Sequence, residues 1–300
     1  MIISRDVQSE EAPKPVEIDW VSVSDISVPL GEITFNGVKF AAVPRIKAAV
    51  NLPRNLRGIH ASRTYEAVKW GVSQVDGSTF HHLTSIIARR LLEQHAYSTE
   101  AYVSVRAKFF SADKTPVSMV DSLEHFEVAL KSYAKRLDTS LQLRNFVGVR
   151  AAGITACPCA KEVVREIYSK VNGGVSDGTP IATHMQRSYA SILLESDGIT
   201  SFLDLLDVLK QSFSSRTMEL LKRPDEAALV IEAVESPRFV EDVVRYAAEA
   251  VVRKFPYVPD VNVVAIRVKS LESIHQHNLE SSLITTLGNL RRQLGDKSVA

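Results

Sequence analysis

Both cysteines of the chain lie in one short stretch, GITACPCAKE, at residues 153–162. Cys157 and Cys159 flank Pro158 at the end of an apolar segment that predicts a β-strand, and on an extended chain both thiols would face the same way. A disulfide across a single residue would close a small, strained ring, so the pair indicates reduced thiols. Each cysteine could be a small buried apolar side chain. The alternative is a thiolate that binds a metal or acts as a nucleophile, and this function requires partners elsewhere in the chain.

Histidines near predicted strand ends are candidate partners. His184 lies in THMQRS, and His275 and His277 form an H-x-H pair in LESIHQHN. On an extended chain this pair would place both rings on one face, which suits one metal ion or an acid–base pair but also occurs in surface turns. Four other histidines fall in helical or alternating surface patterns and are predicted to be solvated or to cap helices: His81, His82, His95 and His125.

Two further segments carry charges that could act on a substrate. In RGIHASR, His60 lies between Arg57 and Arg63, and guanidinium groups match the oxygen atoms of a phosphate. The same pattern also fits the N-terminus of a helix with solvated arginines. Glu219 in ELLKRPDE and Glu235 in VESPRFVED flank a stretch broken by proline, and taken alone each would be an ordinary surface carboxylate.

The hydrophobic periodicity predicts an α+β protein with antiparallel sheets backed by helices. Residues 1–20 form an arm that is flexible or orders against something else. The order strand, strand, helix, helix, strand, strand is predicted in residues 21–140 and again, without sequence identity, in residues 141–300. The predicted elements are a hairpin within 33–50 around Asn36-Gly37, helices at 64–75 and 79–96 behind a Ser78/Thr79 cap, strands around 102–109 and 126–131, a strand at 145–156, a helix at 160–171, a strand at 185–195, helices at 200–212 and 237–254, and a last strand from 262.

Composition excludes several classes of protein. The chain has 300 residues, 45% of them hydrophobic, and its formal net charge of +1 gives no global field that would recruit nucleic acid or an anionic membrane. No apolar segment is long enough for a transmembrane helix, and the charged first residues do not form a signal peptide, so we expect a cytoplasmic protein. Neither a GxGxxG nor a GxxxxGK[ST] nucleotide loop occurs.

Taken together, six blocks resemble the type IB GTP cyclohydrolases. They are LPxxxRGxHxSR (Leu52 to Arg63), GxxxCPC (Gly153 to Cys159), HxQRS (His184 to Ser188), ELLKRPDE, ESPRFVED and ESIHxH (Glu272 to His277), and they follow the family's order over nearly the whole chain. The DVQ near the N-terminus and the wording GITACPCA are most similar to the archaeal MptA branch.

The resemblance implies a bimodular tunnelling fold (T-fold) of two ββααββ-like modules, whose sheets assemble into barrels in a homotetramer with active sites between subunits. It implies hydrolytic opening of the guanine imidazole ring of GTP at C8, loss of formate and closure to a 7,8-dihydroneopterin phosphate. A divalent metal would activate the water, and acids and bases nearby would move the protons.

The matching motifs also imply roles for single residues. The metal would be bound by Cys157, His184 and Glu219, and Glu235 would hold the guanine edge. Proton transfer, or completion of the metal shell, would fall to Glu272, His275 and His277. The substrate phosphates would be bound by Arg57, His60, Arg63, Arg187, Lys222 and Arg223. Cys159 has no assigned role and is expected to pack against Cys157 or tune it.

The archaeal branch implies Fe(II) and a 2′,3′-cyclic phosphate product, although thiolate, imidazole and carboxylate ligands alone also allow Mn(II) or Zn(II). Two other functions are compatible with the same fold. One is a nitrile reductase in which the cysteine is a covalent nucleophile and NADPH donates hydride. The other is a non-catalytic module that binds a purine or a metal.

Overall fold

The computed structural model describes residues 6–35, 38–76, 79–176, 179, 181–196 and 200–295. The chain forms two compact units that interleave along the sequence. The first unit comprises Met1–Lys108, Val128–Val147 and Glu195–Ile199, and the second comprises Phe109–Glu127, Gly148–Leu194 and Thr200–Ala300. Three long strands, β5 (Glu100–Lys114), β6 (Asp121–Arg136) and β7 (Leu141–Ala156), contribute residues to both units. The predicted division into 21–140 and 141–300 stays a prediction.

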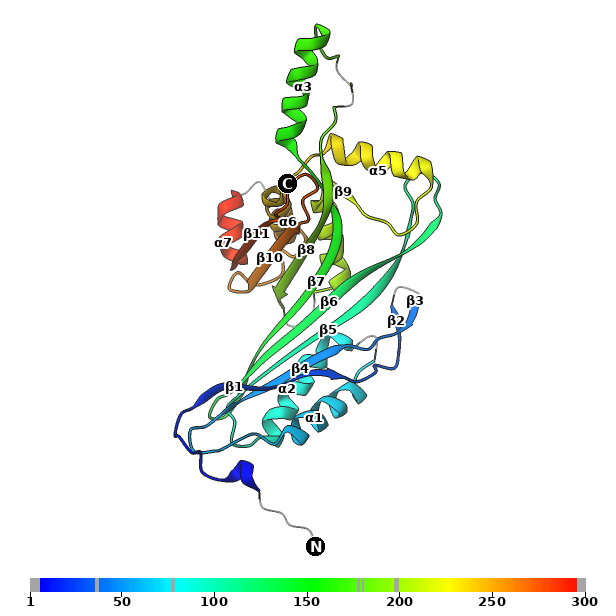
Figure 1. The fold of residues 1–300 in the computed structure, drawn as a ribbon. Helices are drawn as coiled ribbons and strands as arrows, with labels where there is room; N and C mark the ends of the chain where they lie inside the picture. The colour runs from blue at the N-terminus through cyan, green and yellow to red at the C-terminus, as the bar shows by residue number, and fades with distance from the viewer. Residues whose placement is uncertain are drawn as a thin grey trace. The chain divides into compact units, whose positions relative to one another are not determined.

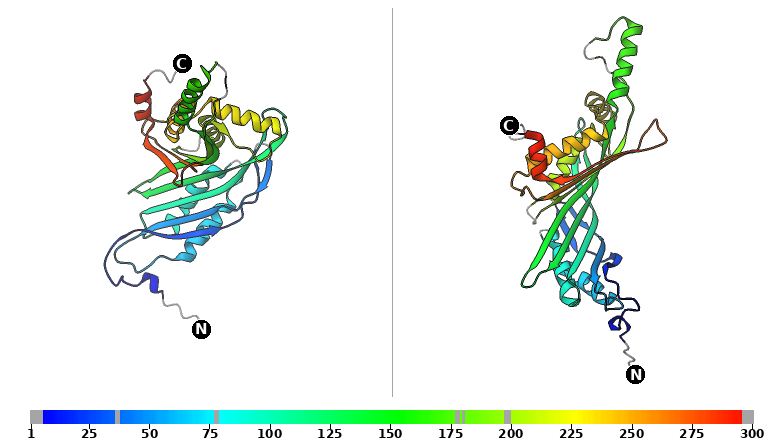
Figure 2. Two further views of the ribbon diagram at one scale, coloured as in Figure 1. Left: turned by 45° about the horizontal axis from the view of Figure 1, so that its top comes forward. Right: turned by 90° about the vertical axis from the view of Figure 1, so that its left-hand side faces the viewer.

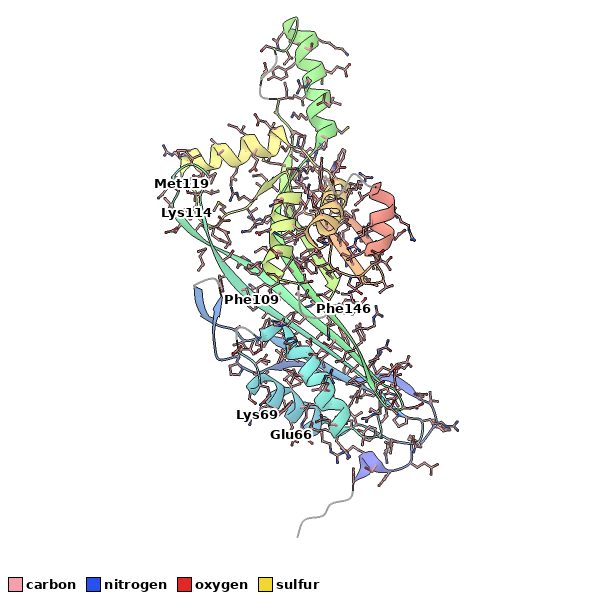
Figure 3. All side chains as sticks on the ribbon, turned by 180° about the vertical axis from the view of Figure 1, so that it is seen from behind. Glu66, Lys69, Phe109, Lys114, Met119 and Phe146 are labelled. Atoms are coloured by element: carbon pink, nitrogen blue, oxygen red, sulfur yellow. The ribbon has the colours of Figure 1, made fainter. Side chains whose placement is uncertain are left out.

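The first unit is a sheet in the order β1-β4-β5-β6-β7, with two helices (Figure 1). Its other strands are β1 (Ile18–Ser27) and β4 (Arg45–Leu52), which pair antiparallel, and its helices are α1 (Ala61–Ser73) and α2 (Leu83–Gln94). The helices pack closely because Gly71 has no side chain: a Cβ there would lie 2.4 Å from Cγ1 of Ile87. The outer side of α1 carries charged residues such as Glu66 and Lys69 (Figure 3).

Several predictions for this unit are confirmed and others need correction. Strands β2 (Glu32–Phe35) and β3 (Val38–Ala41) form the expected antiparallel hairpin, while its Asn36-Gly37 turn lies outside the described residues. The same stretch holds a third strand, β4, that was not predicted. The predicted helix at 79–96 begins as a 3-10 turn, η2 (Phe80–His82), and the Thr79 hydroxyl caps no helix because it accepts from the Asp76 N–H instead. Ser78 lies outside the described residues.

The second unit places strands in the order β7-β8-β10-β11, with β9 paired to β7. These strands are β8 (Met185–Glu195), β9 (Ser215–Arg216), β10 (Val263–Ser270) and β11 (Leu279–Thr286), and β10 pairs antiparallel with both β8 and β11. Helices α4 (Phe202–Ser212) and α6 (Val240–Lys254) bury apolar faces that include Leu205, Leu209, Val243 and Val251. Figure 2 shows these elements from two further directions.

Two of the remaining helices of this unit have a proline in the first turn. The chain leaves β7 at Ala156 and enters α3 (Pro158–Asn172) directly, because proline is favoured in the first turn of a helix. The expectation that both thiols face the same way on an extended chain is therefore wrong. In the same way Pro224 lies in the first turn of α5 (Arg223–Glu235), so the proline does not break this segment, contrary to the prediction. Strand β11 and helix α7 (Leu287–Leu294) were also not predicted.

No helix in the described ranges is both long enough and apolar enough to span a membrane.

Candidate functional site

Cys157 lies at the junction of β7 and α3, where it is the N-cap residue of the helix. Its Sγ accepts a hydrogen bond from the Ala160 N–H at 3.4 Å, and its thiol is half-buried, whereas Cys159 is exposed in the first turn of α3. The N-terminus of a helix favours negative charge, so this position suits a thiolate. The two cysteines therefore have different environments despite their proximity in sequence.

His184 is fixed next to Cys157 by the backbone. The Cys157 N–H donates to the His184 carbonyl at 3.1 Å, and the Thr183 hydroxyl donates to the Cys157 carbonyl at 2.6 Å. These bonds join the end of β7 to the residues that precede β8. The predicted proximity of the cysteine and the histidine is thus a property of the single chain.

The His184 ring is held by Gln186, a residue of the HxQRS motif to which no role was predicted. His184 Nδ1 lies 3.0 Å from Gln186 Oε1, while Gln186 Nε2 donates to the Thr155 hydroxyl at 3.1 Å. Among the residues that the structure describes, His184 Nε2 has no hydrogen-bond partner. One ring nitrogen is engaged by the protein and the other is available to a ligand.

The H-x-H pair lies beside this ring. The His275 and His277 rings stack with centroids 5.0 Å apart, and the His184 ring stands perpendicular to His275 with centroids 6.3 Å apart. The chain from 271 to 278 is a loop after β10 and not the extended strand that was expected. Both rings are exposed, and Glu272, which precedes them, is partly buried.

Glu235 ends α5 and approaches the start of α3. Lys161, one turn beyond Cys157, donates from Nζ to the carbonyl of Val234 at 2.6 Å, and Ala156 forms a β-bridge with Arg238. The end of β7, the start of β8, the loop after β10 and the end of α5 therefore meet at one end of the second unit's sheet. This group, Cys157, His184, Glu235, Glu272, His275 and His277, is called the strand-end cluster below.

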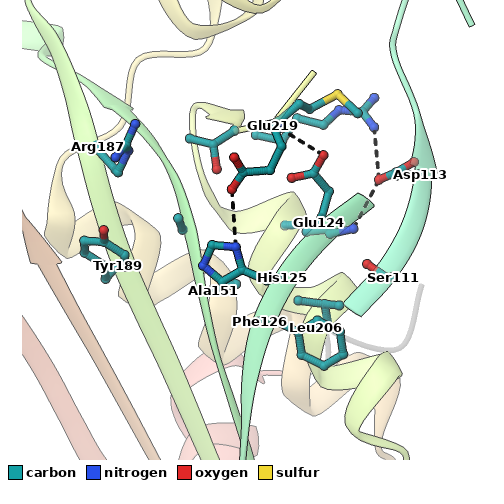
Figure 4. A pocket seen from close by; sticks show the side chains of 15 residues that line it. Ser111, Asp113, Glu124, His125, Phe126, Ala151, Arg187, Tyr189, Leu206 and Glu219 are labelled. Atoms are coloured by element: carbon teal, nitrogen blue, oxygen red, sulfur yellow. Dashed lines mark hydrogen bonds and ion pairs between the residues drawn. The ribbon is translucent and has the colours of Figure 1, made fainter. Parts of the chain in front are cut away.

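Glu219 lies in a different place, a cavity of about 170 Å³ in the second unit (Figure 4). Its carboxylate pairs with His125 Nδ1 at 3.3 Å, and its N–H donates to Glu124 at 3.1 Å. Arg187 and Tyr189 also line this cavity. His125 is half-exposed, so the sequence prediction of solvation is correct for it, but its pairing with Glu219 was not foreseen.

A buried carboxylate fixes the segment that follows Glu219. Asp225, fully buried, accepts from the Val117 and Ser118 N–H groups at 2.9 Å and from the Lys222 N–H at 3.0 Å. Burial alone would raise its pKa, but the hydrogen bonds, led by the Ser118 hydroxyl, outweigh this effect and place the pKa well below its usual range. The segment is thereby tied to the turn between β5 and β6, where Met119 has φ 54° (Figure 3). Lys222 and Arg223 stay exposed at the N-terminus of α5.

The predicted phosphate-binding residues of RGIHASR lie in the first unit, at the N-terminus of α1. His60 is the N-cap residue but makes no side-chain cap bond, and Arg63 approaches the Gln94 carbonyl at 3.5 Å. The N-terminal arm packs on this loop: Arg57 pairs with Glu10 at 3.1 Å, and His60 lies 3.5 Å from Asp6. The arm is therefore ordered against the basic loop from residue 6 onward.

His95 lies beneath the same loop and is the C-cap residue of α2, so the predicted capping role is confirmed and the alternative of a solvated ring is wrong. It is fully buried, with Nε2 3.1 Å from the Thr64 hydroxyl and Nδ1 2.9 Å from the Tyr97 hydroxyl. Burial, reinforced by the positive charge of Arg63, lowers the pKa of His95 to about 4. The neutral ring is a structural bridge between α1 and the residues before β5.

Comparison with known proteins identifies the family. A family model described as type I GTP cyclohydrolase folE2 matches residues 5–281. The chain belongs to that family. The GTP cyclohydrolase MptA of Methanocaldococcus jannaschii is 33% identical over 96% of this chain and 97% of its own length. The GTP cyclohydrolase MptA of Methanoculleus marisnigri is 34% identical over 95% of this chain and 96% of its own. The resemblance seen in the sequence is confirmed, and the protein is an enzyme of the GTP cyclohydrolase class.

Solved structures confirm the architecture. A uricase from Bacillus fastidious superimposes with a TM-score of 0.55 at 8% identity and covers 93% of this chain and 96% of its own. The urate oxidase of Bacillus sp. TB-90 gives a TM-score of 0.53 at 8% identity, covering 90% of this chain and 100% of its own. These likenesses indicate a fold of the tunnelling type and support the predicted α+β class with antiparallel sheets.

The single chain does not assemble the predicted metal ligands. Within the described part of the chain, no three His, Cys, Asp or Glu side chains come close enough together to hold a metal ion. Cys157 and His184 are neighbours, but Glu219 is engaged with His125 in its own cavity. The spacing of these residues in the sequence could not reveal that Glu219 lies apart from Cys157 and His184. Their positions depend on the strands to which their segments are attached.

Proposed function

We propose that the protein hydrolyses GTP at C8 of the guanine ring, releases formate and forms a 7,8-dihydroneopterin phosphate. Membership of the GTP cyclohydrolase family supports the substrate and the reaction class. The observation in the structure that carries the proposal is the strand-end cluster, where Cys157, whose thiol caps a helix, is joined by a backbone hydrogen bond to His184, a histidine with one ring nitrogen unpartnered among the described residues. Ring opening needs an activated water and groups that move protons, and this cluster contains candidates for both.

Two residues of the cluster have the chemistry of ligands for a divalent transition metal. A thiolate and a neutral imidazole with a free lone pair are ligands that such metals prefer, and Cys157 and His184 would supply them. When bound, the metal would supply the Lewis acidity that activates water at neutral pH. We propose Glu219 as the third ligand, brought to the other two by assembly of subunits or by movement of the segment after β9. Fe(II) is the preferred metal, and Mn(II) and Zn(II) fit the same ligands.

The other residues of the cluster would act on the substrate. The Glu235 carboxylate can accept two N–H bonds from the N1 and 2-amino edge of guanine. Its position at the end of α5, tied to α3 by Lys161, supports this role. The exposed rings of His275 and His277 would transfer protons together with Glu272. The triphosphate would be bound by Arg57, His60, Arg63, Arg187, Lys222 and Arg223.

We further propose that the chain comprises two T-fold modules, 21–140 and 141–300, and forms a homotetramer in which sheets join into barrels. Support comes from the outer strand of the second unit. Strand β11 pairs only with β10 within the described residues, and it exposes Leu279 and Ile284. An uncovered edge with apolar side chains is a site where another sheet can add. An active site shared between subunits would also explain why Glu219 lies apart from Cys157 in one chain.

The reaction is tested with anaerobically purified protein incubated with GTP and, separately, Fe(II), Mn(II) or Zn(II). Formate release and the mass of the pterin product are measured. Formate with a cyclic monophosphate mass, strongest with Fe(II), is the expected result. Formate with a triphosphate product would retain the reaction and reject the cyclic product. Absence of formate with every metal would overturn the proposed function.

A further inference from the structure

We propose that Gln186 is a positioning residue that fixes the tautomer of His184 and so presents the lone pair of Nε2 to the metal. Gln186 lies at the start of β8, two residues after His184. The inference rests on the proposed role of His184 as a ligand. It concerns an amide that lies behind the histidine and has no contact with substrate assigned to it.

The orientation of the amide decides the argument. Gln186 Nε2 donates to Thr155, and Gln186 Oε1 faces both His184 Nδ1, at 3.0 Å, and the Ser273 hydroxyl, at 3.3 Å. An amide oxygen can only accept hydrogen bonds. With the amide in this orientation, His184 Nδ1 carries the proton, and in the neutral ring Nε2 keeps its lone pair.

Buried hydroxyl groups support the amide from behind. Thr155 on β7 lies 2.7 Å from the Ser188 hydroxyl on β8 and 3.4 Å from the Ser270 hydroxyl on β10. All three side chains are buried, and they come from three adjacent strands. An apolar sheet would not retain three buried hydroxyls unless they were mutually satisfied, and here the network ends at Gln186. Through these hydrogen bonds the sheet restrains the Gln186 amide, and the amide restrains the His184 ring.

The arrangement performs the task that a carboxylate or carbonyl oxygen performs behind many metal-binding histidines. Such partners fix the ring orientation, and their loss typically weakens metal binding about 10- to 100-fold. An amide differs from a carboxylate because it adds no charge. The expected consequence is a histidine that is oriented without an additional negative charge beside the Cys157 thiolate.

The test compares Gln186→Leu, Gln186→Glu and the matched control Gln276→Leu, which makes the same substitution at an exposed residue of the nearby loop. Nitrogen-15 NMR of the metal-free proteins reports the His184 tautomer, and competition with a chromophoric chelator reports the affinity for Zn(II). Thermal unfolding of the metal-free proteins verifies that each variant is folded.

We expect wild type and Gln276→Leu to show His184 with the proton on Nδ1. Gln186→Leu should lose this preference and bind Zn(II) about 10- to 100-fold more weakly. Gln186→Glu, which retains an acceptor, should restore both. An unchanged tautomer in Gln186→Leu would overturn the inference, and so would unchanged Zn(II) affinity in that variant.

His184→Ala separates this inference from the proposed function. If His184→Ala binds Zn(II) as tightly as wild type, the histidine is not a ligand and the proposed metal site fails. If His184→Ala loses the metal while Gln186→Leu behaves as Gln276→Leu does, only the positioning role is wrong.

Discussion

His95 and His184 show how differently two histidines of one chain can be used. His95 is fully buried, and each of its ring nitrogens has a hydroxyl partner within 3.1 Å. His184 is only partly buried, and the protein engages one of its ring nitrogens and leaves the other available. A ring whose polar atoms are all satisfied supports the structure, whereas a ring held on one side only can bind a ligand. The number of unpartnered nitrogens therefore separates the two roles better than exposure alone.

The largest expected effect is on metal binding by Cys157 and His184. Cys157→Ala and His184→Ala should each lower metal content to near background, because the loss of one of three or four ligands removes much of the binding energy. Cys159→Ala is the matched control, since its exposed thiol lies in the same turn. Metal is measured by mass spectrometry after anaerobic dialysis. Equal loss in Cys159→Ala would mean that both thiols are ligands.

The reverse pattern is expected for the buried histidine. His95→Ala should lower the free energy of unfolding by about 2–4 kcal/mol, because it leaves a cavity and two hydroxyls without their partner. Its metal content per folded chain should equal that of wild type. Urea unfolding followed by circular dichroism gives the first quantity and mass spectrometry the second. A His95 variant that is fully stable but free of metal would contradict the structural role of His95.

The low pKa of His95 also predicts a pH dependence of stability. Above pH 6.5 the ring is neutral in both the folded and the unfolded chain. Between pH 6.5 and about 4 the unfolded chain binds a proton that the folded chain does not, so the free energy of unfolding falls, by about 3 kcal/mol in total. Below pH 4 this contribution is constant. The measurement compares urea unfolding of wild type and His95→Gln at pH 7.5 and 4.5, and equal pH slopes would contradict the prediction.

The smallest effect is expected at the basic loop RGIHASR, where acidic residues of the N-terminal arm pair with Arg57 and His60. Glu10→Gln should strengthen binding of inorganic triphosphate roughly two- to fivefold, because the carboxylate competes for the Arg57 guanidinium and an exposed pair is worth up to about 1 kcal/mol. Glu11→Gln, an exposed neighbour, is the control with the same change of charge. Isothermal titration calorimetry at low salt measures both. Weaker binding in Glu10→Gln would mean that Glu10 positions Arg57 and does not compete.

The sequence predicted the elements that have strong hydrophobic periodicity. It also predicted which strand ends carry the candidate site residues. Alternation identified parts of β5 and β6, and strands were also predicted over β7 and β8. The polar clusters near these strands correctly placed Cys157 and His184 at strand ends. The predicted orientation of the Cys159 thiol was wrong because Pro158 begins a helix. Helix α5 was missed because Pro224 indicated a break in the chain, whereas it lies in the first turn of that helix. Burial of His95 depends on Thr64, a partner from another helix, which no local pattern shows.

Single residues in the site were harder to predict for a similar reason. Gln186 and Thr155 act through hydrogen bonds between strands, and their residue types occur equally often as solvated surface groups. Likewise, the motif predicts a functional role for the Glu219 carboxylate, but its pairing with His125 arises only when β6 and the segment after β9 are brought together. Local sequence specifies the type of each group, and the topology of the sheet specifies its partners.

Helix α3 has a consequence for how assembly could be observed. None of its 15 residues is buried in the single chain, although Val163, Ile167 and Tyr168 form an apolar stripe. Its contacts lie mainly in the first turn, through the Cys157 cap and Lys161. In an isolated subunit its amide hydrogens should therefore exchange with solvent within seconds, fastest toward Asn172, whereas a second subunit over the stripe would slow them greatly. The hydrogen-exchange rate of the α3 amides therefore reports subunit association without an enzymatic assay.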